Sequence, residues 1–157
     1  GFHVGSCKYS HITVFSFHPV KIITTGEGGL ATTNDPLIAQ QLEDLRSHGI
    51  VKDQSRLFLK NPPPWLYEQQ SLGFNYRMTD IQAALGLSQL KRIDQIVKQR
   101  NEKFNIYLEL TKDLPLRFLK IPDYIYSSLH LAVISFNNIN DTKHREIFIQ
   151  MNQQKSV

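Results

Sequence analysis

The chain has 157 residues, of which 41% are apolar and nine are phenylalanine, so it has the material for a buried core and is unlike a disordered protein. Its 18 Lys and Arg residues exceed its 14 Asp and Glu residues by four, an excess too small by itself to indicate a nucleic-acid partner. Cys7 is the single cysteine, which excludes an internal disulfide and a cysteine-based metal cluster and fits a cytoplasmic location. No apolar run approaches the ~18 residues of a membrane-spanning helix, and no signal peptide is visible.

The first part of the chain predicts two short strands followed by a helix. β-Branched and aromatic residues favour a strand over residues 13–17, and a second strand is expected over residues 30–33 after a glycine-rich turn. Asp35 is a candidate N-cap with proline directly after it, and the apolar residues behind it recur at helical spacing. Gly49 stands where a left-handed residue ends such a helix. Residues 50–72 contain three consecutive prolines and predict an exposed loop.

The second half predicts a long helix, a strand and a further helix. The segment Thr79–Gln82 has the spacing of a capping box, and apolar residues at helical spacing predict a helix over roughly residues 80–110. A buried strand is expected over residues 129–136, a turn over 137–141 and a last helix over about 142–152. This order of strands and helices indicates an α/β fold.

Lys21 is the sharpest candidate for a functional side chain. It closely follows a strand and precedes a glycine-rich turn, a position in which its amine can be held rigidly and attack a carbonyl carbon. Ser16, five residues earlier, offers a hydroxyl suited to a phosphate oxygen. From residue types alone, a solvated surface lysine is the more frequent outcome, because lysines are mostly exposed.

Several stretches resemble, in this order, the active-site region of the DegT/DnrJ/EryC1/StrS family of sugar aminotransferases. The blocks are Ser16–Lys21, Thr24–Gly29, Thr33–Asp35, Leu45–Gly49, Gly73–Gly86 and Ser128–Leu131. These enzymes use pyridoxal 5'-phosphate (PLP) and have the aspartate-aminotransferase fold (fold type I). The resemblance implies an α/β fragment of that fold, with the C-terminal part of the PLP-binding large domain in residues 1–92. Residues 93–157 would then form a bridging helix and an incomplete small α/β domain.

Carried over by position, the resemblance implies that Lys21 binds PLP covalently and later moves a proton, and that Ser16 binds the cofactor phosphate. Asn75 is implied to reach the phosphate held by the neighbouring subunit, in a homodimer with shared active sites. Since no methionine begins the chain and the family's upstream aspartate motif is missing, we expect an internal fragment that does not catalyse the reaction by itself.

The resemblance leaves five further polar residues without a role: His18, Glu27, His48, Arg77 and His130. His18 and His48 are expected to be packed or solvent-facing. His130 is expected to be a core or edge residue of a strand, with its hydrogen bonds satisfied, rather than a ligand.

The implied reaction is the transamination of a nucleotide-linked 4-keto-6-deoxy sugar. Residues 18–21, His-Pro-Val-Lys, and 88–91, Ser-Gln-Leu-Lys, are most similar to a branch of the family that aminates C4 of a UDP-linked N-acetyl sugar in pseudaminic-acid synthesis. The resemblance implies glutamate as the amino donor and a role in surface-polysaccharide or flagellin-glycan synthesis. A nucleic acid, a membrane and a metal ion are not expected as partners.

Two alternatives remain open at this point. Five basic residues crowd the predicted long helix and suggest a module that tracks nucleic-acid phosphates; they are Lys91, Arg92, Lys98, Arg100 and Lys103. The other alternative is a non-catalytic fragment that serves only as a dimerisation surface and holds no cofactor.

Overall fold

A computed structural model describes residues 2–137 and 140–154 of the chain. The chain divides into two compact units, Gly1–Arg92 and Ile93–Val157. That these units belong to a large and a small domain stays a prediction. None of the helices in the described ranges combines the length and the apolar character that crossing a membrane requires.

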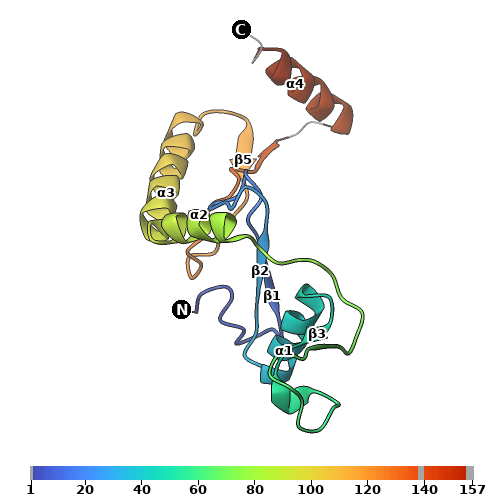
Figure 1. Cartoon of the computed structure of the whole chain (residues 1–157). Helices are drawn as coiled ribbons and strands as arrows, with labels where there is room; N and C mark the ends of the chain where they lie inside the picture. The colour runs from blue at the N-terminus through green and yellow to red at the C-terminus, as the bar shows by residue number, and fades with distance from the viewer. Residues whose placement is uncertain (1, 138–139, 155–157) are drawn as a thin grey trace. The chain divides into compact units, whose positions relative to one another are not determined.

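An antiparallel hairpin of β1 (Thr13–Ser16) and β2 (Gly29–Thr32) is the first element of unit 1, and the two strands run side by side in Figure 1. Both strands are predicted from the sequence to within one residue at each end. The register pairs Ser16 with Gly29. A Cβ at Gly29 would lie 2.8 Å from the carbonyl oxygen of Phe15, so the close approach of the strands at this end requires glycine.

Helix α1 (Pro36–Arg46) begins where its cap predicts. The Asp35 carboxylate accepts hydrogen bonds from the backbone N–H groups of Leu37 and Ile38, which have no partner inside the helix. After the helix, His48 and Gly49 have φ angles of 64° and 69°, so the left-handed exit predicted for Gly49 already starts at His48.

The region 50–72 is not the continuous loop that the sequence predicts. Strand β3 (Ile50–Val51) pairs with β4 (Glu68–Gln69) in an antiparallel hairpin, and a short 3₁₀ helix, η1 (Gln54–Arg56), follows β3. The proline run lies inside the connection between the two strands. The sequence prediction assigns the whole region to a loop because of these prolines. It misses the pairing of Ile50–Val51 with Glu68–Gln69, which forms only when the chain folds back.

The helix predicted over 80–110 consists of two helices, α2 (Asp80–Leu90) in unit 1 and α3 (Ile93–Leu110) in unit 2. The capping box at the start of α2 is confirmed, because the Thr79 side chain accepts from the Gln82 N–H and the Gln82 side chain accepts from the Thr79 N–H. At the other end the Arg92 N–H donates to the Gln89 carbonyl, three residues back, at 2.9 Å. This tightened last turn ends the helix, whereas apolar spacing continues through the break and conceals it.

In unit 2, β5 (Leu116–Phe118) and β6 (Ile134–Phe136) form an antiparallel pair, and α4 (Asp141–Gln154) ends the described chain. The strand predicted over 129–136 is therefore shorter at its start. Leu129 has a φ of 52°, which interrupts a strand. The turn predicted over 137–141 includes residues 138–139, which lie outside the described residues.

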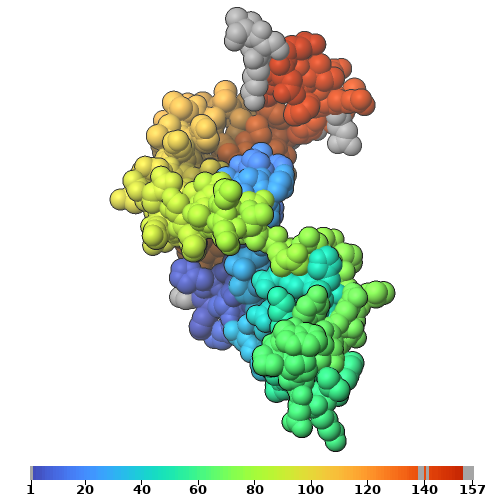
Figure 2. Space-filling view, viewed as in Figure 1, coloured from blue at the N-terminus to red at the C-terminus, as the bar shows by residue number. Residues whose placement is uncertain are grey.

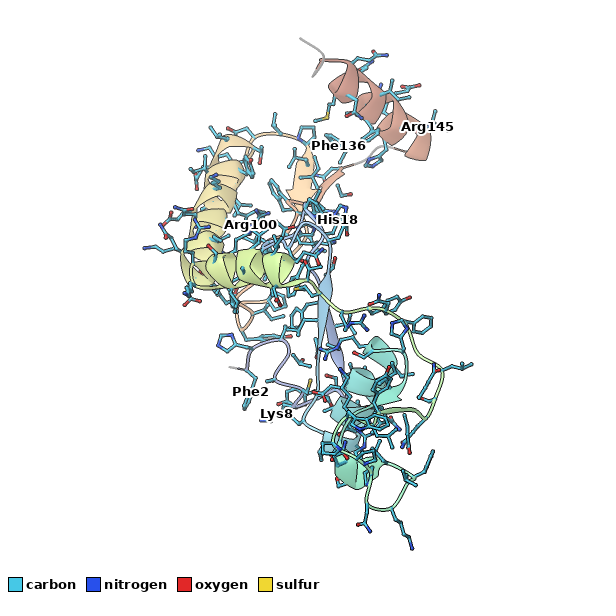
Figure 3. The ribbon with its side chains drawn as sticks, viewed as in Figure 1. Phe2, Lys8, His18, Arg100, Phe136 and Arg145 are labelled. Carbon is cyan, nitrogen blue, oxygen red and sulfur yellow. The ribbon has the colours of Figure 1, made fainter. Side chains whose placement is uncertain are left out.

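Side-chain hydrogen bonds from α3 hold the segment that precedes β6. Arg100 lies on α3 and is labelled in Figure 3. It donates from Nε to the Leu129 carbonyl at 2.9 Å and from a terminal nitrogen to the His130 carbonyl at 2.7 Å. Asn101 donates to the Ser127 carbonyl at 3.0 Å. Phe104 of α3 packs edge-on against Phe118 of β5, with ring centroids 5.1 Å apart. In unit 2, side chains of α3 thus hold the segment before β6 by donating hydrogen bonds to its backbone carbonyls.

The core of the described chain is small, contrary to the expectation from its apolar content. Ile23 and Val51, exposed to 8% and 2%, are the buried apolar side chains among the described residues. Large apolar side chains of α2 stay exposed, among them Ile81 at 85% and Leu87 at 60%, and this yellow-green helix lies open on the face shown in Figure 2. Apolar surface of this extent is typical of a contact region.

Candidate active site

Lys21 lies at the end of a tight turn just beyond β1. Its backbone N–H donates to the His18 carbonyl at 2.9 Å, which closes the turn, and the residue is exposed. Ser16 is the last residue of β1 and is exposed as well. The Ser16 hydroxyl oxygen accepts a long hydrogen bond of 3.4 Å from the His18 N–H. Ser16 and Lys21 therefore lie on either side of one turn.

We call residues 17–28 the Lys21 loop. Its two ends meet at Phe17, whose carbonyl accepts from the Thr25 N–H at 3.0 Å and from the Thr24 hydroxyl at 2.8 Å. The Phe17 N–H in turn donates to the Gly28 carbonyl at 2.9 Å. These bonds close the loop around Lys21 independently of the turn that contains it.

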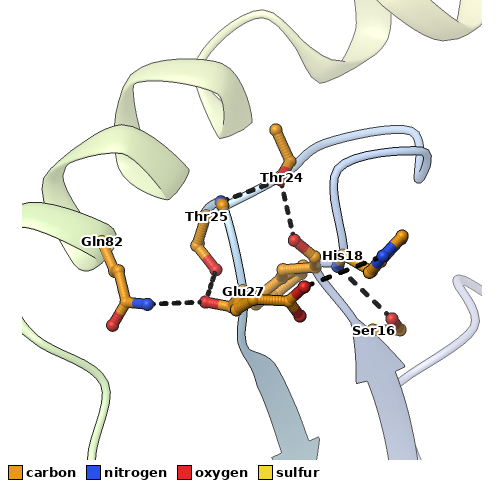
Figure 4. Close-up of polar contacts among 8 residues, drawn as sticks. Ser16, His18, Thr24, Thr25, Glu27 and Gln82 are labelled. Carbon is orange, nitrogen blue, oxygen red and sulfur yellow. Dashed lines mark hydrogen bonds and ion pairs between the residues drawn. The ribbon is translucent and has the colours of Figure 1, made fainter.

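Helix α2 contacts the later part of the Lys21 loop (Figure 4). Gln89 accepts from the Thr24 N–H at 3.2 Å and donates to the Thr24 carbonyl at 3.1 Å. Gln82 donates from Nε2 to the Glu27 carbonyl at 3.0 Å. The Thr25 hydroxyl donates to the same carbonyl at 2.7 Å, and this threonine is only 3% exposed. Two glutamines on the same face of α2 thus hold the backbone that follows Lys21.

His18 and Glu27, which the sequence leaves without roles, face each other across this loop (Figure 4). His18 Nε2 lies 3.7 Å from Glu27 Oε1, and the two side chains are 49% and 73% exposed. An ion pair at this distance and exposure contributes at most about 1 kcal/mol when the histidine is protonated. The pair therefore adds little to the closure of the loop.

Asn75 lies on a different segment from Ser16 and Lys21. It forms an isolated bridge with Ser47, and the neighbouring N–H groups of Phe74 and Tyr76 donate to the Leu45 and Arg46 carbonyls at the end of α1. No hydrogen bond joins Asn75 to Ser16 or Lys21 in the described part of the chain. Ser16 and Lys21 thus belong to one hydrogen-bonded turn region, whereas the described hydrogen bonds of the Asn75 segment go to the end of α1.

A wide, mixed-charge cleft of about 740 Å³ opens between α1 and the β3–β4 hairpin. Arg77 and His48 line it, together with Asp44 and Arg56, whose side chains form a bidentate ion pair across it. The Asp44 carboxylate holds the pKa of Arg56 above its ordinary value through this hydrogen bond. The cleft thus contains basic groups, but one of them is already paired with an acid.

His130 contradicts the prediction made for it. It lies outside β6, and its Nδ1 is a buried atom without a hydrogen-bond partner among the described atoms. Ser127, Leu129 and Phe104 border a cavity of about 100 Å³ beside it. In the described part of the chain, no group of three His, Cys, Asp or Glu side chains could hold a metal ion.

Solved structures similar to this chain include aminotransferases. The chain superposes on Helicobacter pylori PseC, an aminotransferase involved in the biosynthesis of pseudoaminic acid, with a TM-score of 0.78 and 34% identity, covering 93% of this chain and 37% of that one. It superposes on the PLP form of Spr1654 from Streptococcus pneumoniae with a TM-score of 0.80 and 26% identity, covering 95% and 37%. The class is therefore an α/β protein with part of the fold of the PLP-dependent aminotransferases.

Sequence comparison narrows this class. The profile of the DegT/DnrJ/EryC1/StrS aminotransferase family matches residues 2–157, and the chain belongs to that family. It is 42% identical over 128 residues to the UDP-4-amino-4,6-dideoxy-N-acetyl-beta-L-altrosamine transaminase of Campylobacter jejuni subsp. jejuni serotype O:2, covering 81% of this chain and 32% of that protein. The chain thus spans about a third of the length of the relatives it matches.

The contacts of α2 with the Lys21 loop escaped prediction from the sequence. Gln82 is recognised there only as a member of the capping box, and Gln89 only within a similar stretch. The available signal is their spacing with Gly86: positions i, i+4 and i+7 lie on one face of a helix. That pattern shows a shared face but does not show which segment lies against it.

Proposed function

We propose that the protein to which this chain belongs is a PLP-dependent transaminase that aminates C4 of a nucleotide-linked 4-keto-6-deoxy sugar, with Lys21 as the catalytic residue. The observation that carries this proposal is the exposed Lys21 on a closed loop beside Ser16, in a chain 42% identical to a sugar-nucleotide transaminase. The finer assignments, a UDP-linked N-acetyl sugar and glutamate as the donor, are supported by that relative and by the sequences of residues 18–21 and 88–91.

The residues of the loop fit PLP, which carries an aldehyde and a phosphate. Lys21 offers an exposed amine for the carbonyl carbon. The Ser16 oxygen is engaged only as an acceptor, so its O–H is free to donate to a phosphate oxygen. When bound, PLP supplies the electron sink for the electron pair released at the substrate carbon.

Lys21 Nζ then has two tasks. When PLP is bound, Nζ would hold it covalently through the cofactor's carbonyl carbon. Nζ would also move protons: it would accept one from the α-carbon of the amino donor and, in the second half-reaction, donate one to C4 of the sugar. The same amine thus acts first as a covalent anchor and then as a general acid–base group. The closed loop would limit how far this amine can move between the two tasks.

Asn75 serves, in this proposal, the active site of a second copy in a homodimer. Its segment is tied to the end of α1 and makes no described contact with Ser16 or Lys21, which is consistent with a role toward another chain. The wide exposure of apolar side chains on α2 supports extensive burial against further protein. The 157 residues alone then supply only part of a site and are expected to be inactive. The single Cys7 fits a cytoplasmic location for the whole enzyme.

The full-length enzyme with Lys21→Arg tests the proposal. Guanidinium does not lose its proton at neutral pH, so this variant is expected to show no turnover with sugar and glutamate. In the wild type, borohydride should bleach the yellow cofactor and leave its reduced form on the peptide that contains Lys21. Lys60→Arg, in the exposed proline-rich connection, is the matched control and should behave as the wild type. Retained transamination in Lys21→Arg would contradict the proposal.

The alternatives receive less support. Arg100 is occupied by the Leu129 and His130 carbonyls, so one of the five basic residues is not free for phosphates. A dimerisation fragment without catalytic function predicts a colourless full-length protein that PLP does not reconstitute. The borohydride experiment therefore separates that alternative from the transaminase.

A further inference from the structure

We propose that Gln82, Gly86 and Gln89 form a docking face on α2 that fixes the Thr24–Glu27 segment and, through it, the position of the Lys21 amine. The two glutamines are then positioning residues for the reaction, which they do not contact themselves. This inference rests on the role proposed above for Lys21.

The bond pattern of Gln89 is the first argument. Its side-chain amide accepts from the Thr24 N–H and donates to the Thr24 carbonyl, at 3.2 and 3.1 Å, so it satisfies both backbone groups of one residue. A neighbouring strand pairs with an extended residue in the same way. The two residues are 65 positions apart in the sequence and partly buried, so the contact is a tertiary one and not a local turn.

Gly86 provides the second argument, because it lies between the glutamines on the same face. A Cβ at this position would be 2.8 Å from the methyl carbon of Thr25, which is closer than real side chains come. Thr25 is 3% exposed, so its methyl group has little room to move away. The glycine therefore permits the close approach of α2 to the loop.

Gln82 completes the face at the other end of the segment. Its Nε2 donates to the Glu27 carbonyl, while its Oε1 accepts from the Thr79 N–H and from the Thr79 hydroxyl, each at 3.0 Å. The capping box thus orients the amide that holds Glu27. Both ends of the Thr24–Glu27 segment are bound to one rigid helix.

The loop geometry transmits this restraint to Lys21. Thr24 and Thr25 both donate to the Phe17 carbonyl, so fixing them on α2 also fixes the start of the loop. Lys21 lies between these two ends, in a turn closed by its own N–H. Because misplacing a reacting group by about 1 Å can cost around 100-fold in rate, the contacts of α2 are expected to act mainly on turnover.

The test compares Gln89→Met with Gln89→Glu in the PLP-loaded full-length enzyme. Met fills similar volume and removes both hydrogen bonds, whereas Glu keeps the acceptor for the Thr24 N–H and removes the donor. We expect kcat to fall about 10- to 100-fold for Met and less for Glu, with an unchanged KM for the sugar. Gln99→Met, at an exposed position of α3, is the matched control and should keep the wild-type kcat.

Hydrogen exchange in the cofactor-free protein gives a second readout that needs no activity. The Thr24 amide is expected to exchange about 5- to 10-fold faster in Gln89→Met, because it loses a hydrogen bond of ordinary strength. Unchanged exchange at Thr24 would overturn the docking face. Faster exchange with unchanged kcat would overturn the positioning role. If borohydride leaves no cofactor on Lys21 of the wild type, the proposed function itself fails, and the exchange result still decides whether the docking face exists.

Discussion

Two loops of unit 1 are held by different chemistry. The Lys21 loop, residues 17–28, is bound by amides and hydroxyls: Gln82 and Gln89 hold its backbone and Thr24 closes its ends. The connection between β3 and β4, residues 52–67, is bound largely by carboxylates. Glu68 accepts from the Phe58 N–H at 2.8 Å and the Leu59 N–H at 3.3 Å.

The other carboxylates of the β3–β4 connection act in the same way. Asp53 accepts from the Ser55 N–H at 2.9 Å and from its hydroxyl at 2.7 Å, and Asp44 pairs with Arg56. The Ser55 hydrogen bonds lower the pKa of Asp53, and the Phe58 N–H, followed by Gln70, lowers the pKa of Glu68. The difference teaches that the Lys21 loop is held largely by amides and hydroxyls, which do not titrate, so these contacts do not make its geometry depend on pH.

The largest expected effect comes from filling the docking face at Gly86. Overpacking costs about 1–3 kcal/mol, whereas alanine in place of glycine within a helix normally gains up to about 1 kcal/mol. Gly86→Ala should therefore lower the thermal unfolding midpoint of the full-length protein and speed exchange in the Lys21 loop. The β3–β4 connection should exchange as before.

Rescue by a second substitution makes this prediction specific. Thr25→Ser removes the methyl group that a Cβ at Gly86 would meet, and it keeps the hydroxyl that donates to Glu27. The double variant Gly86→Ala/Thr25→Ser should recover most of the lost stability, and Thr25→Ser alone serves as the control. A Gly86→Ala protein more stable than the wild type would show that α2 does not press against the loop.

A smaller effect is expected from Thr79→Ala at the start of α2. Loss of an N-cap hydroxyl costs about 1 kcal/mol, and here it also removes one of the groups that orient the Gln82 amide. Amides of residues 24–28 should exchange faster, while those of residues 54–59 should not. Thr79→Ser keeps the cap and is the control. Equal acceleration in both loops would mean that the substitution loosens unit 1 as a whole and would remove the contrast between them.

The smallest effect is the response of the β3–β4 connection to acid. Because the pKa of Glu68 is lowered in the folded protein, its stabilising contribution is present above the ordinary glutamate pKa and is lost as the pH falls through the lowered value. NMR signals of the Phe58 and Leu59 amides should shift over this range, and that of the Thr24 amide should not. Glu68→Gln should give the acid-like signals at neutral pH. A Thr24 amide that titrates together with Phe58 would contradict the comparison.

Local signals predict much of unit 1 and less of unit 2. The strands around Lys21, the Asp35 cap and the Thr79–Gln82 capping box depend on neighbours within a few residues, and all are observed as expected. The strand Leu116–Phe118 was missed because it lies between prolines and gains its partner only from β6. Apolar periodicity continued across the end of α2 and gave one helix in place of two.

In the candidate site, too, local features are predictable from the sequence and contacts between distant segments are not. Ser16 and Lys21 are recognisable from one short stretch, and a left-handed exit near Gly49 needs only local chemistry. His130 is expected to have its hydrogen bonds satisfied within a strand. Instead, Arg100 donates to the carbonyls of both His130 and Leu129, and the His130 Nδ1 has no partner among the described atoms. Whether a buried polar side chain finds a hydrogen-bond partner depends on atoms from distant segments of the chain, and a local sequence pattern does not predict these.

The sequence by itself determined the family and the ends of α1, because these depend on residue identity and on spacing within a few positions. Only the tertiary structure decided what lies against α2. Gln89 and Thr24 meet across 65 positions, and Gly86 is required by a methyl group that sequence spacing does not place. The physical reason is that a side-chain amide can bind any exposed backbone, and the packing of the helix selects which one it binds.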